Sequence, residues 1–260
     1  MLMPVLGPKK VWQTTNRWDI DVLYKLQDKS GRDFGLAFTH EDVVTPLVQK
    51  HAKSYKDFPF AVYQIQDKFR MELRAKSGLF RGREFFMKDM YSFHLSETER
   101  DIYYETVREA YKKIFARLGI GERTYVTYAS GGDFSKYSDE FQTLSAAGED
   151  TIYICTGCNV AINKEIKDEN ATCPDCGSVE FREERSIEVG NIFKLGTKFS
   201  EPYHFMVQNE SGEDVLVTMC PYGIGVNRMM GTIAELLHDE NGLVWPENVA
   251  PFSVHLLSLG

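Results

Sequence analysis

The residues best suited to chemistry begin with a run of positive charge inside an acidic chain. From residue 68 to residue 88, seven basic side chains face two acids, Glu72 and Glu84; the basic residues are Lys68, Arg70, Arg74, Lys76, Arg81, Arg83 and Lys88. Guanidinium groups stay charged and bind phosphate through paired hydrogen bonds. The stretch could therefore hold a polyphosphate. The alternative is a charged hairpin that is merely solvated.

Cysteines form the second candidate site. Four of the five cysteines stand in two CxxC pairs that are fourteen residues apart, namely Cys155, Cys158, Cys173 and Cys176. Each pair presents two thiolates, and two such loops can close a tetrahedron around zinc. Four cysteine ligands leave no open position, so we expect a structural zinc site. The fifth, Cys220, is expected to be a small buried side chain.

A glycine-rich segment near residue 225 is the third candidate. A short apolar strand is predicted over 215–219, and a helix follows to about Leu237. Gly223 and Gly225 would let backbone approach a ligand, and Arg228 would lie in the first turns of a helix whose N-terminus favours anions. The alternative is a close packing turn between strand and helix.

The elements that must position these residues can be read from local patterns. The basic residues lie on a predicted hairpin, with one strand over 60–69, a break at 75–78, and a second strand containing Phe85. A helix is expected to start at Thr39 or Thr45 and to run to about residue 55.

The clearest helix opens with the capping box at 96–99 and ends at Gly119, and its apolar spacing indicates packing. Strands are predicted over 125–129 and 141–144, around a polar glycine-rich turn at 130–133. Residues 1–38 show short extended pieces with little helix signal, and residues 249–260 read as a connector and one apolar strand with partners beyond Gly260.

Composition limits the class of protein. The chain has 260 residues, 43% of them hydrophobic, and a net charge of −8, which suits a globular core and argues against indiscriminate coating of nucleic acid. A locally basic groove for a specific RNA remains possible. No apolar run reaches membrane-spanning length and the start does not resemble a signal peptide, so we expect a cytoplasmic location.

Several motifs, in order, resemble those of bacterial-type prolyl-tRNA synthetases, a class II aminoacyl-tRNA synthetase family. Residues 3–8 are similar to the end of motif 1, 69–85 to motif 2, and 222–228 to motif 3. Residues 39–41 resemble the loop that contacts the amino acid, and 138–142 resemble a strand lining the same pocket.

This resemblance implies an α+β fold, with an antiparallel sheet of six to seven strands flanked by helices. Residues 1–150 would form the first part of the catalytic core, 151–185 a zinc-ribbon-like insertion, 186–248 the second part, and 249–260 the start of a connector to an anticodon-binding domain. We expect the helix before motif 1 and the anticodon-binding domain to be missing from the sequence. No editing domain is expected either, and so no hydrolysis of mischarged alanyl-tRNA in cis.

The resemblance also implies proline:tRNA ligase activity in a homodimer, with ATP, Mg²⁺, proline and tRNA(Pro) as partners. Two anions, proline carboxylate and ATP, must react, so the site needs positive charge where negative charge develops. Arg70 would bridge the proline carboxylate and the α-phosphate, Arg228 would bind the far phosphates, and Arg81 would support the bent triphosphate.

Adenine and proline contacts follow by the same resemblance. Glu72 would accept a hydrogen bond from the adenine amino group, Phe85 would stack on the base, and Gln142 would face ATP or ribose. Thr39 and Glu41 would hold the cationic ring nitrogen of proline. Asp139 stands where the family usually has histidine, against bound proline.

Two alternatives stay open. Because of Asp139, the chain could be an adenylating paralogue that uses another amino acid or acceptor. It could also be a non-catalytic relative that binds RNA or protein, although Arg70, Glu72, Phe85 and Arg228 are residues that a binding module would not need.

Overall fold

One mixed sheet organises the molecule. The computed structural model describes residues 1–73, 75, 77–132, 136–254 and 256–258, so Arg74 and Lys76 of the basic stretch and Asp133 of the predicted turn lie outside the described residues. The eight strands, in spatial order, are β4 (Phe60–Phe69), β5 (Glu84–His94), β13 (Thr218–Gly225), β10 (Phe181–Phe193), β7 (Tyr137–Leu144), β6 (Thr124–Ser130), β9 (Ala161–Asn163) and β8 (Asp150–Cys155).

Six of these strands, β4 to β6 in that order, form an antiparallel sheet, as expected from the resemblance. The other two belong to the segment that carries the cysteines. Strand β9 pairs parallel with β6, and β8 pairs both with β9 and with the first half of the long strand β10. The pairings β6–β7–β10–β8–β9–β6 therefore close a ring, which attaches the insertion to the main sheet by backbone hydrogen bonds.

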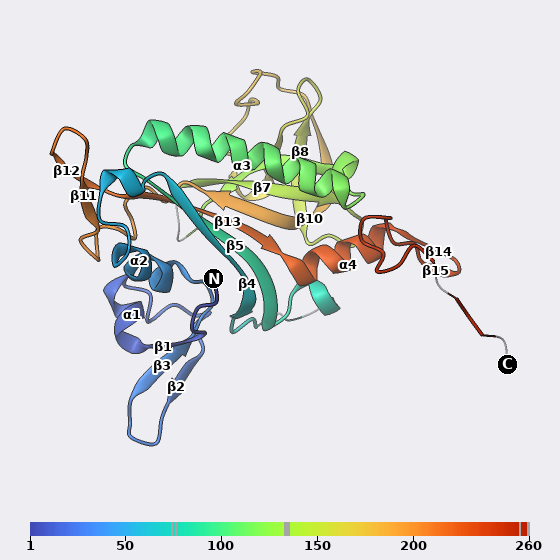
Figure 1. The fold of residues 1–260 in the computed structure, drawn as a ribbon. Helices are drawn as coiled ribbons and strands as arrows, with labels where there is room; N and C mark the ends of the chain where they lie inside the picture. Colours follow the sequence, from blue (N-terminus) through green and yellow to red (C-terminus); the bar gives the residue numbers. More distant parts are fainter. Residues whose placement is uncertain (74, 76, 133–135, 255, 259–260) are drawn as a thin grey trace.

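Helix α3 (Glu97–Arg117) covers one face of the sheet (Figure 1). Ser96 caps it by accepting a hydrogen bond from the backbone N–H of Glu99 at 3.2 Å, and Gly119, at φ +77°, follows its end. Both predicted ends are confirmed. The buried side of the helix packs into the main hydrophobic core through Tyr104, Val107, Tyr111 and Phe115.

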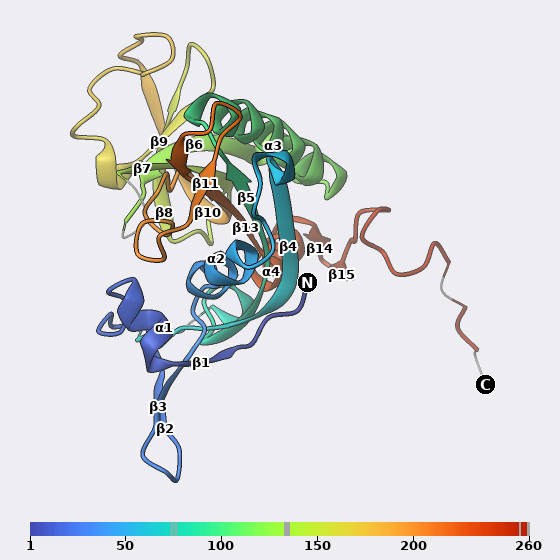
Figure 2. The same ribbon diagram turned by 60° about the vertical axis from the view of Figure 1, so that its left-hand side comes forward.

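The N-terminal part forms a small unit beside the sheet (Figure 2). Its three-stranded sheet has the order β1 (Leu6–Pro8), β3 (Asp33–Leu36) and β2 (Lys25–Gln27), and helix α1 (Lys9–Thr14) packs on it through the buried Trp12. The sequence did not predict α1, which is short and has no side-chain cap. Helix α2 (Glu41–Gln49) starts at the first of the two predicted positions but ends before residue 55.

The predicted strand over 215–219 is wrong in its boundaries. Residues Asp214–Leu216 form β12, which pairs with β11 (Met206–Gln208) in a separate hairpin, and β13 then runs from Thr218 to Gly225. The glycines therefore lie inside a central strand that runs directly into α4 (Val226–Leu236), with no intervening turn.

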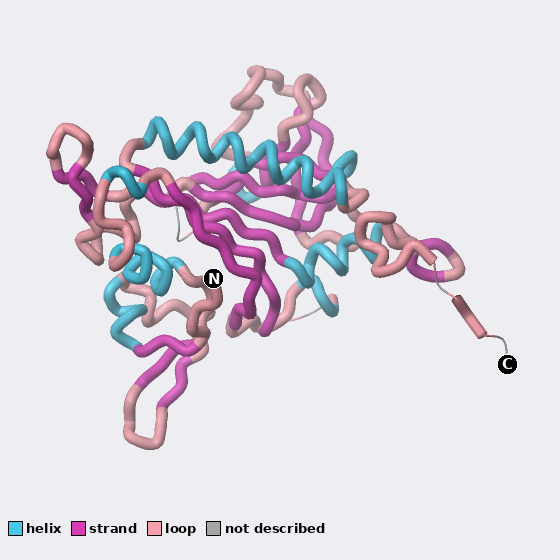
Figure 3. The backbone as a smooth tube through the Cα atoms, viewed as in Figure 1, coloured by secondary structure: helices cyan, strands magenta, loops and turns pink. Residues whose placement is uncertain are grey.

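Beyond α4, β14 (His238–Asp239) and β15 (Gly242–Leu243) form a two-residue ladder. The described residues after 249 contain no strand, and the strand predicted there, with partners beyond Gly260, stays a prediction. Residues 251–254 and 256–258 extend away from the rest of the molecule (Figure 3). Among the described helices, none combines the length and apolar character needed to cross a membrane.

Candidate active site

A cavity of about 440 Å³ lies on the sheet face opposite α3. The strands β5, β13, β10 and β7 form its floor. Arg70, Glu72, residues 79–82 and Arg228 form one wall, and Phe38, Thr39 and Glu41 with Arg17 form the other. Seven of the nine residues predicted to bind ATP or proline line it: Thr39, Glu41, Arg70, Glu72, Arg81, Phe85 and Arg228. The sheet thus brings three separate sequence segments together around one space.

Arg70 follows the end of β4 and lies between the two ends of the cavity. Its Nε donates to the carbonyl oxygen of Phe38 at 3.3 Å, and its guanidinium lies 5.2 Å from the centre of the Phe85 ring. Burial lowers the pKa of Arg70, and the like charge of Arg228 lowers it further. Arg70 and Arg228 therefore repel each other, and an anionic ligand between them would offset that repulsion.

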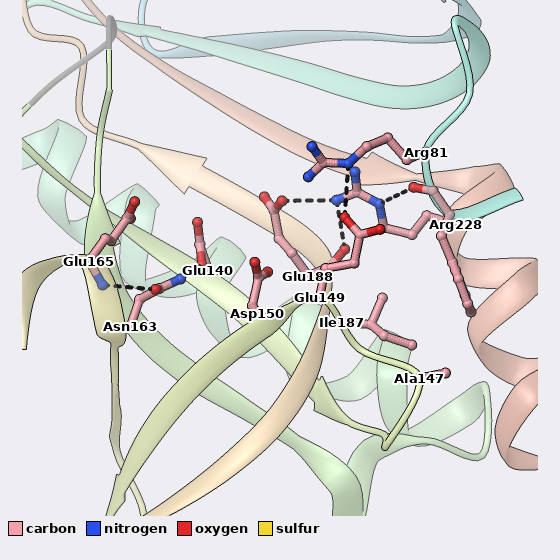
Figure 4. A pocket seen from close by; sticks show the side chains of 11 residues that line it. Arg81, Glu140, Ala147, Glu149, Asp150, Asn163, Glu165, Ile187, Glu188 and Arg228 are labelled. Carbon is pink, nitrogen blue, oxygen red and sulfur yellow. Dashed lines mark hydrogen bonds and ion pairs between the residues drawn. The ribbon is translucent and has the colours of Figure 1, made fainter. Parts of the chain in front are cut away.

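Arg228 and Arg81 lie at one end, and protein carboxylates hold both of them (Figure 4). Arg228 donates through Nη1 to Glu188 Oε2 at 2.9 Å and through Nε to the carbonyl oxygen of Phe80 at 2.9 Å. Arg81 Nε is 3.0 Å from Glu149 Oε2, and its Nη1 is 3.5 Å from Glu72 Oε2. These contacts orient two guanidinium groups toward the same region.

The opposite end carries a buried carboxylate. The hydroxyl of Thr39 donates to the carboxylate of Glu41 at the start of α2. Burial raises the pKa of Glu41, and the positive charge of Arg17 opposes that shift. Arg17 Nη1 lies 3.7 Å from Glu41 Oε2 and 2.8 Å from Asp42 Oδ2. The sequence prediction missed Arg17, because it stands in a segment without a motif.

Asp139 and Gln142 do not line the cavity. Asp139 Oδ2 accepts a hydrogen bond from the Tyr104 hydroxyl at 3.1 Å and lies 3.5 Å from Arg108 Nε, so its side chain faces α3. The structure thus directs Asp139 away from the cavity in which proline was expected to bind: neighbouring strand residues point to opposite faces, and Glu140 is the one in the cavity. Gln142 is fully buried, and its amide donates to Glu140 Oε2 and Asp150 Oδ2 at 2.8 and 2.9 Å.

A second cavity of about 140 Å³ adjoins the first, and the two share Phe80, Arg81, Glu140, Glu188 and Arg228. In Figure 4 the carboxylates of Glu140, Asp150 and Glu188 lie between the two arginines on one side and Asn163 on the other. Burial, and next the charge of Glu188, raise the pKa of Glu140, and burial raises that of Asp150. These carboxylates lie close enough to repel one another, but among the described residues only the four cysteines form a group with the spacing of a metal site.

The position of Gly223 supports in part the prediction that glycines near residue 225 let the backbone approach a ligand. It lies on the cavity floor, and a Cβ added there would stand 2.9 Å from the Met87 Cε. Any larger residue at this position would have to displace Met87 or occupy the ligand space. The Met87 Cε is the flexible end of a side chain and can move aside, so crowding alone does not require glycine here.

The four predicted cysteine ligands meet at the far end of the insertion. Their sulfur atoms all lie within 4.8 Å of one another, with Cys155–Cys176 and Cys158–Cys173 at 3.5 Å. A tetrahedron with metal–sulfur bonds of about 2.3 Å has sulfur–sulfur edges of about 3.8 Å. Burial opposes ionisation of Cys155, but backbone N–H groups of residues 157 and 158 outweigh it and lower its pKa to about 6. The cluster can hold one tetrahedral metal ion. Cys220 lies apart and is buried, as expected.

Comparison with known proteins agrees with this geometry. Over 260 residues the chain is 40% identical to the probable mitochondrial proline–tRNA ligase of Rattus norvegicus, covering 98% of this chain and 54% of that protein. It is 37% identical over 277 residues to the proline–tRNA ligase of Wolbachia sp. subsp. Drosophila simulans (strain wRi), covering 100% and 64%. The chain thus spans between half and two thirds of the length of these curated relatives.

Solved structures share the fold. Prolyl-tRNA synthetase of Giardia lamblia in complex with prolyl-adenylate superposes with a TM-score of 0.76 at 18% identity, over 96% of this chain and 45% of that one. The family described as tRNA synthetase class II core domain (G, H, P, S and T) matches residues 24–236, which include the strands that floor the cavity together with Thr39, Glu41, Arg70 and Arg228, but not Arg17. The antiparallel sheet, its helices and this match show that the chain belongs to the class II tRNA synthetase core domain family.

Proposed function

We propose that this chain is the catalytic part of a proline–tRNA ligase, which activates proline with ATP and transfers it to tRNA(Pro). The observation that carries the proposal is the position of Arg70, in one cavity between the Thr39–Glu41 pair and the arginines at 81 and 228. A cationic amino group suits a carboxylate, and a polyphosphate suits guanidinium groups. The names of the relatives point to the same amino acid.

In the proposed reaction, a carboxylate oxygen of proline attacks the α-phosphorus of ATP. A new oxygen–phosphorus bond forms, and the bond to the leaving pyrophosphate breaks. The nucleophile is already ionised, so no side chain has to remove a proton. Arg70 would contact both anions and stabilise the charge that builds on the α-phosphate oxygens. Glu41 would pair with the ring ammonium of proline and fix the carboxylate toward Arg70.

At the nucleotide end, Arg228 and Arg81 would bind the outer phosphates while Glu188 and Glu149 keep them oriented. Phe85 would stack on adenine, and Glu72 would accept from its amino group. Gln142, which is buried behind Glu140, would act by holding that carboxylate and not by touching ATP. The non-catalytic alternative gives no reason for this convergence of residues in one cavity.

Magnesium would enter bound to ATP. Glu188, which borders the phosphate end, could offer it one carboxylate oxygen, and the ion would neutralise phosphate charge during the reaction. Burial is the main cause that raises the pKa of Glu140 and of Asp150, so positive charge brought by the ligand would favour their ionised forms.

Zinc is the second metal of the proposal. The four sulfur atoms match the donor set and the compact arrangement of a structural zinc site, and no water or substrate position remains. We assign it to a ribbon-like insertion at 151–185, between core parts at 1–150 and 186–248, with residues 249–260 leading to a connector. Homodimer formation and a cytoplasmic location complete the proposal and are checked by light scattering and cell fractionation.

The test is pyrophosphate exchange with MgATP and each of the twenty amino acids. Exchange with proline well above the other amino acids is the expected result. Exchange with a different amino acid would select the paralogue. Asp139, which motivated that alternative, faces α3 and does not line the cavity. Absence of exchange with every amino acid, in protein shown to be folded and dimeric, would refute adenylation and leave the binding relative. Charging of tRNA(Pro) is then measured on the full-length gene product.

A further inference from the structure

Asn163, at the end of β9, links the cysteine insertion to the cavity. Its Nδ2 donates to Glu140 Oε2 at 3.0 Å, the same oxygen that receives the Gln142 amide at 2.8 Å. Its Oδ1 accepts from the backbone N–H of Glu165 at 3.2 Å and so caps the 3₁₀ turn Lys164–Ile166. Two amide donors, one from the core and one from the insertion, thus orient Glu140.

Glu165 makes a second link. Its Oε1 accepts a hydrogen bond of 2.7 Å from the backbone N–H of Ser130. Ser130, Gly131 and Gly132 line the larger cavity, and we call residues 130–132 the pocket lip. A glycine-rich segment has little side-chain packing to hold it, so the place of the lip depends on such contacts.

The first cysteine pair leads directly into these residues. It forms the turn between β8 and β9, which is closed by backbone hydrogen bonds from Cys155 N to the Val160 carbonyl oxygen at 2.9 Å and from Asn159 N to the Cys155 carbonyl oxygen at 3.0 Å. Strand β9 starts at residue 161 and ends at Asn163. A metal ion that fixes the thiolates of this turn therefore also fixes the strand that presents Asn163.

The second cysteine pair is tied to the strand that ends in the lip. Asp175 stands between Cys173 and Cys176, and its Oδ1 accepts a 2.7 Å hydrogen bond from the Tyr128 hydroxyl. Tyr128 belongs to β6, whose last residue is Ser130. Both cysteine pairs thus reach the pocket lip by short chains of contacts.

From these contacts we propose that the cysteine insertion positions the wall of the ligand pocket. Asn163 and Glu165 are its positioning residues, which hold Glu140 and the pocket lip, and the four-thiolate cluster holds Asn163 and Glu165 in place. The identity of the ligand rests on the proposed function. The positioning itself does not, because it concerns contacts within the chain.

Amide hydrogen exchange measures the second link directly, because the acceptor for the Ser130 N–H is a side chain of the insertion. We compare zinc-loaded protein, protein after chelation, and the variant Glu165→Ala. Exchange at residues 130–132 should rise about tenfold or more in the last two. The variant Tyr128→Phe, which keeps all four cysteines, should show a smaller rise in the same peptide. Its matched control is Tyr125→Phe, on the same strand, which loses a 2.8 Å bond to the exposed Arg182 and should leave the lip unchanged.

Steady-state kinetics measures the link to Glu140. The variant Asn163→Asp keeps an oxygen to cap the 3₁₀ turn but replaces the donor to Glu140 with a like charge. We expect its KM for MgATP to rise about tenfold while its KM for proline stays within about twofold, because Glu140 lies at the arginine end of the site. A loss confined to kcat, or an equal change in both KM values, would contradict this placement.

The results of these experiments distinguish failure of the positioning role from failure of the proposed function. Equal exchange at residues 130–132 in zinc-loaded, chelated and Glu165→Ala protein would overturn the positioning role, whatever the activity. If the wild-type chain exchanges no pyrophosphate with proline but chelation still exposes Ser130, the proposed function fails and the positioning stands. In that case equilibrium binding of MgATP replaces KM as the measure for Asn163→Asp.

Discussion

Replacement of Arg70 by alanine separates catalysis from stability. In the protein, Arg70 makes one long hydrogen bond, 3.3 Å to the Phe38 carbonyl oxygen, and a cation–π contact at 5.2 Å from the Phe85 ring centre. A partly exposed contact of this kind contributes about 0.5–1 kcal/mol. Removal of Arg70 also relieves its desolvation and its repulsion with Arg228, and these gains oppose the lost attraction of Glu188, Asp89 and Glu41. The free energy of unfolding should therefore change by about 1 kcal/mol at most.

The effect on adenylation should be much larger. Arg70 is proposed to contact both reacting anions, and loss of a preorganised donor to developing charge costs about 3–4 kcal/mol, a factor of about 10²–10³ in rate. Arg70→Lys keeps the charge but loses the planar fork, so an intermediate loss of about tenfold is expected.

Two measurements check this separation: proline-dependent pyrophosphate exchange, and urea unfolding of the same preparations. Arg32→Ala is the control, since that guanidinium pairs with Asp28 on the exposed β2–β3 hairpin and should leave both quantities unchanged. Exchange within threefold of wild type in Arg70→Ala would refute the assigned role. Parallel loss of activity and of several kcal/mol of stability would show that Arg70 is structural.

Four further predictions use single substitutions. Glu41→Gln should raise the KM for proline about tenfold with little change in the KM for MgATP, because a neutral amide pairs poorly with the ring ammonium; equal changes in both would argue against that role. Burial lowers the pKa of His40 from 6.5 to about 4. As pH falls below 6.5, His40 therefore binds a proton in the unfolded chain but not in the folded one. The free energy of unfolding should drop by about 2 kcal/mol between pH 6.5 and 5. Urea unfolding of His40→Gln should show a smaller drop than wild type, and an identical drop would exclude His40 as the source. Cys158→Ser should lower the zinc content, measured by metal analysis, from about one equivalent per chain to well below half, and should lower the Tm. The same zinc content and Tm in the variant and the wild type would show that the cluster holds no metal. Gly223→Ala places its Cβ 2.9 Å from Met87 Cε, the flexible end of that side chain, so the free energy of unfolding should change by only about 1 kcal/mol or less. The added methyl group lies on the cavity floor and should reduce MgATP binding in calorimetry; unchanged binding would mean that the floor tolerates a methyl group.

Much of the fold could be predicted because its signals are local. The hairpin β4–β5 follows from β-favouring residues on both sides of a glycine-containing turn, and α3 follows from a capping serine, helical spacing and a terminal glycine. The cysteine cluster follows from spacing that only a metal site commonly needs, and its four sulfur atoms do meet. In each case the pattern and its cause lie within a few tens of residues.

The structure differs from the predictions where the outcome depends on distant partners. Asp139 and Glu140 are adjacent, and both sheet faces are covered, one by α3 and the other by the cavity walls. An apolar–polar alternation therefore could not show which acid faces the ligand. The sequence placed Gln142 on the correct face of the sheet. Only the positions of Glu140 and Asp150 show that its amide nitrogen donates both of its hydrogen bonds inside the protein.

The sequence by itself determined the family, the antiparallel hairpin and the residue types that can bind phosphate, a cationic amine and zinc, because these depend on local patterns and on motif order. Only the tertiary structure decided which side chains share the cavity. Arg17, Glu188 and Asn163 carry no motif signal, yet each contacts a predicted site residue or a cavity carboxylate across long stretches of chain. The sheet brings these contacts together through strand order and side-chain direction, which no local pattern encodes.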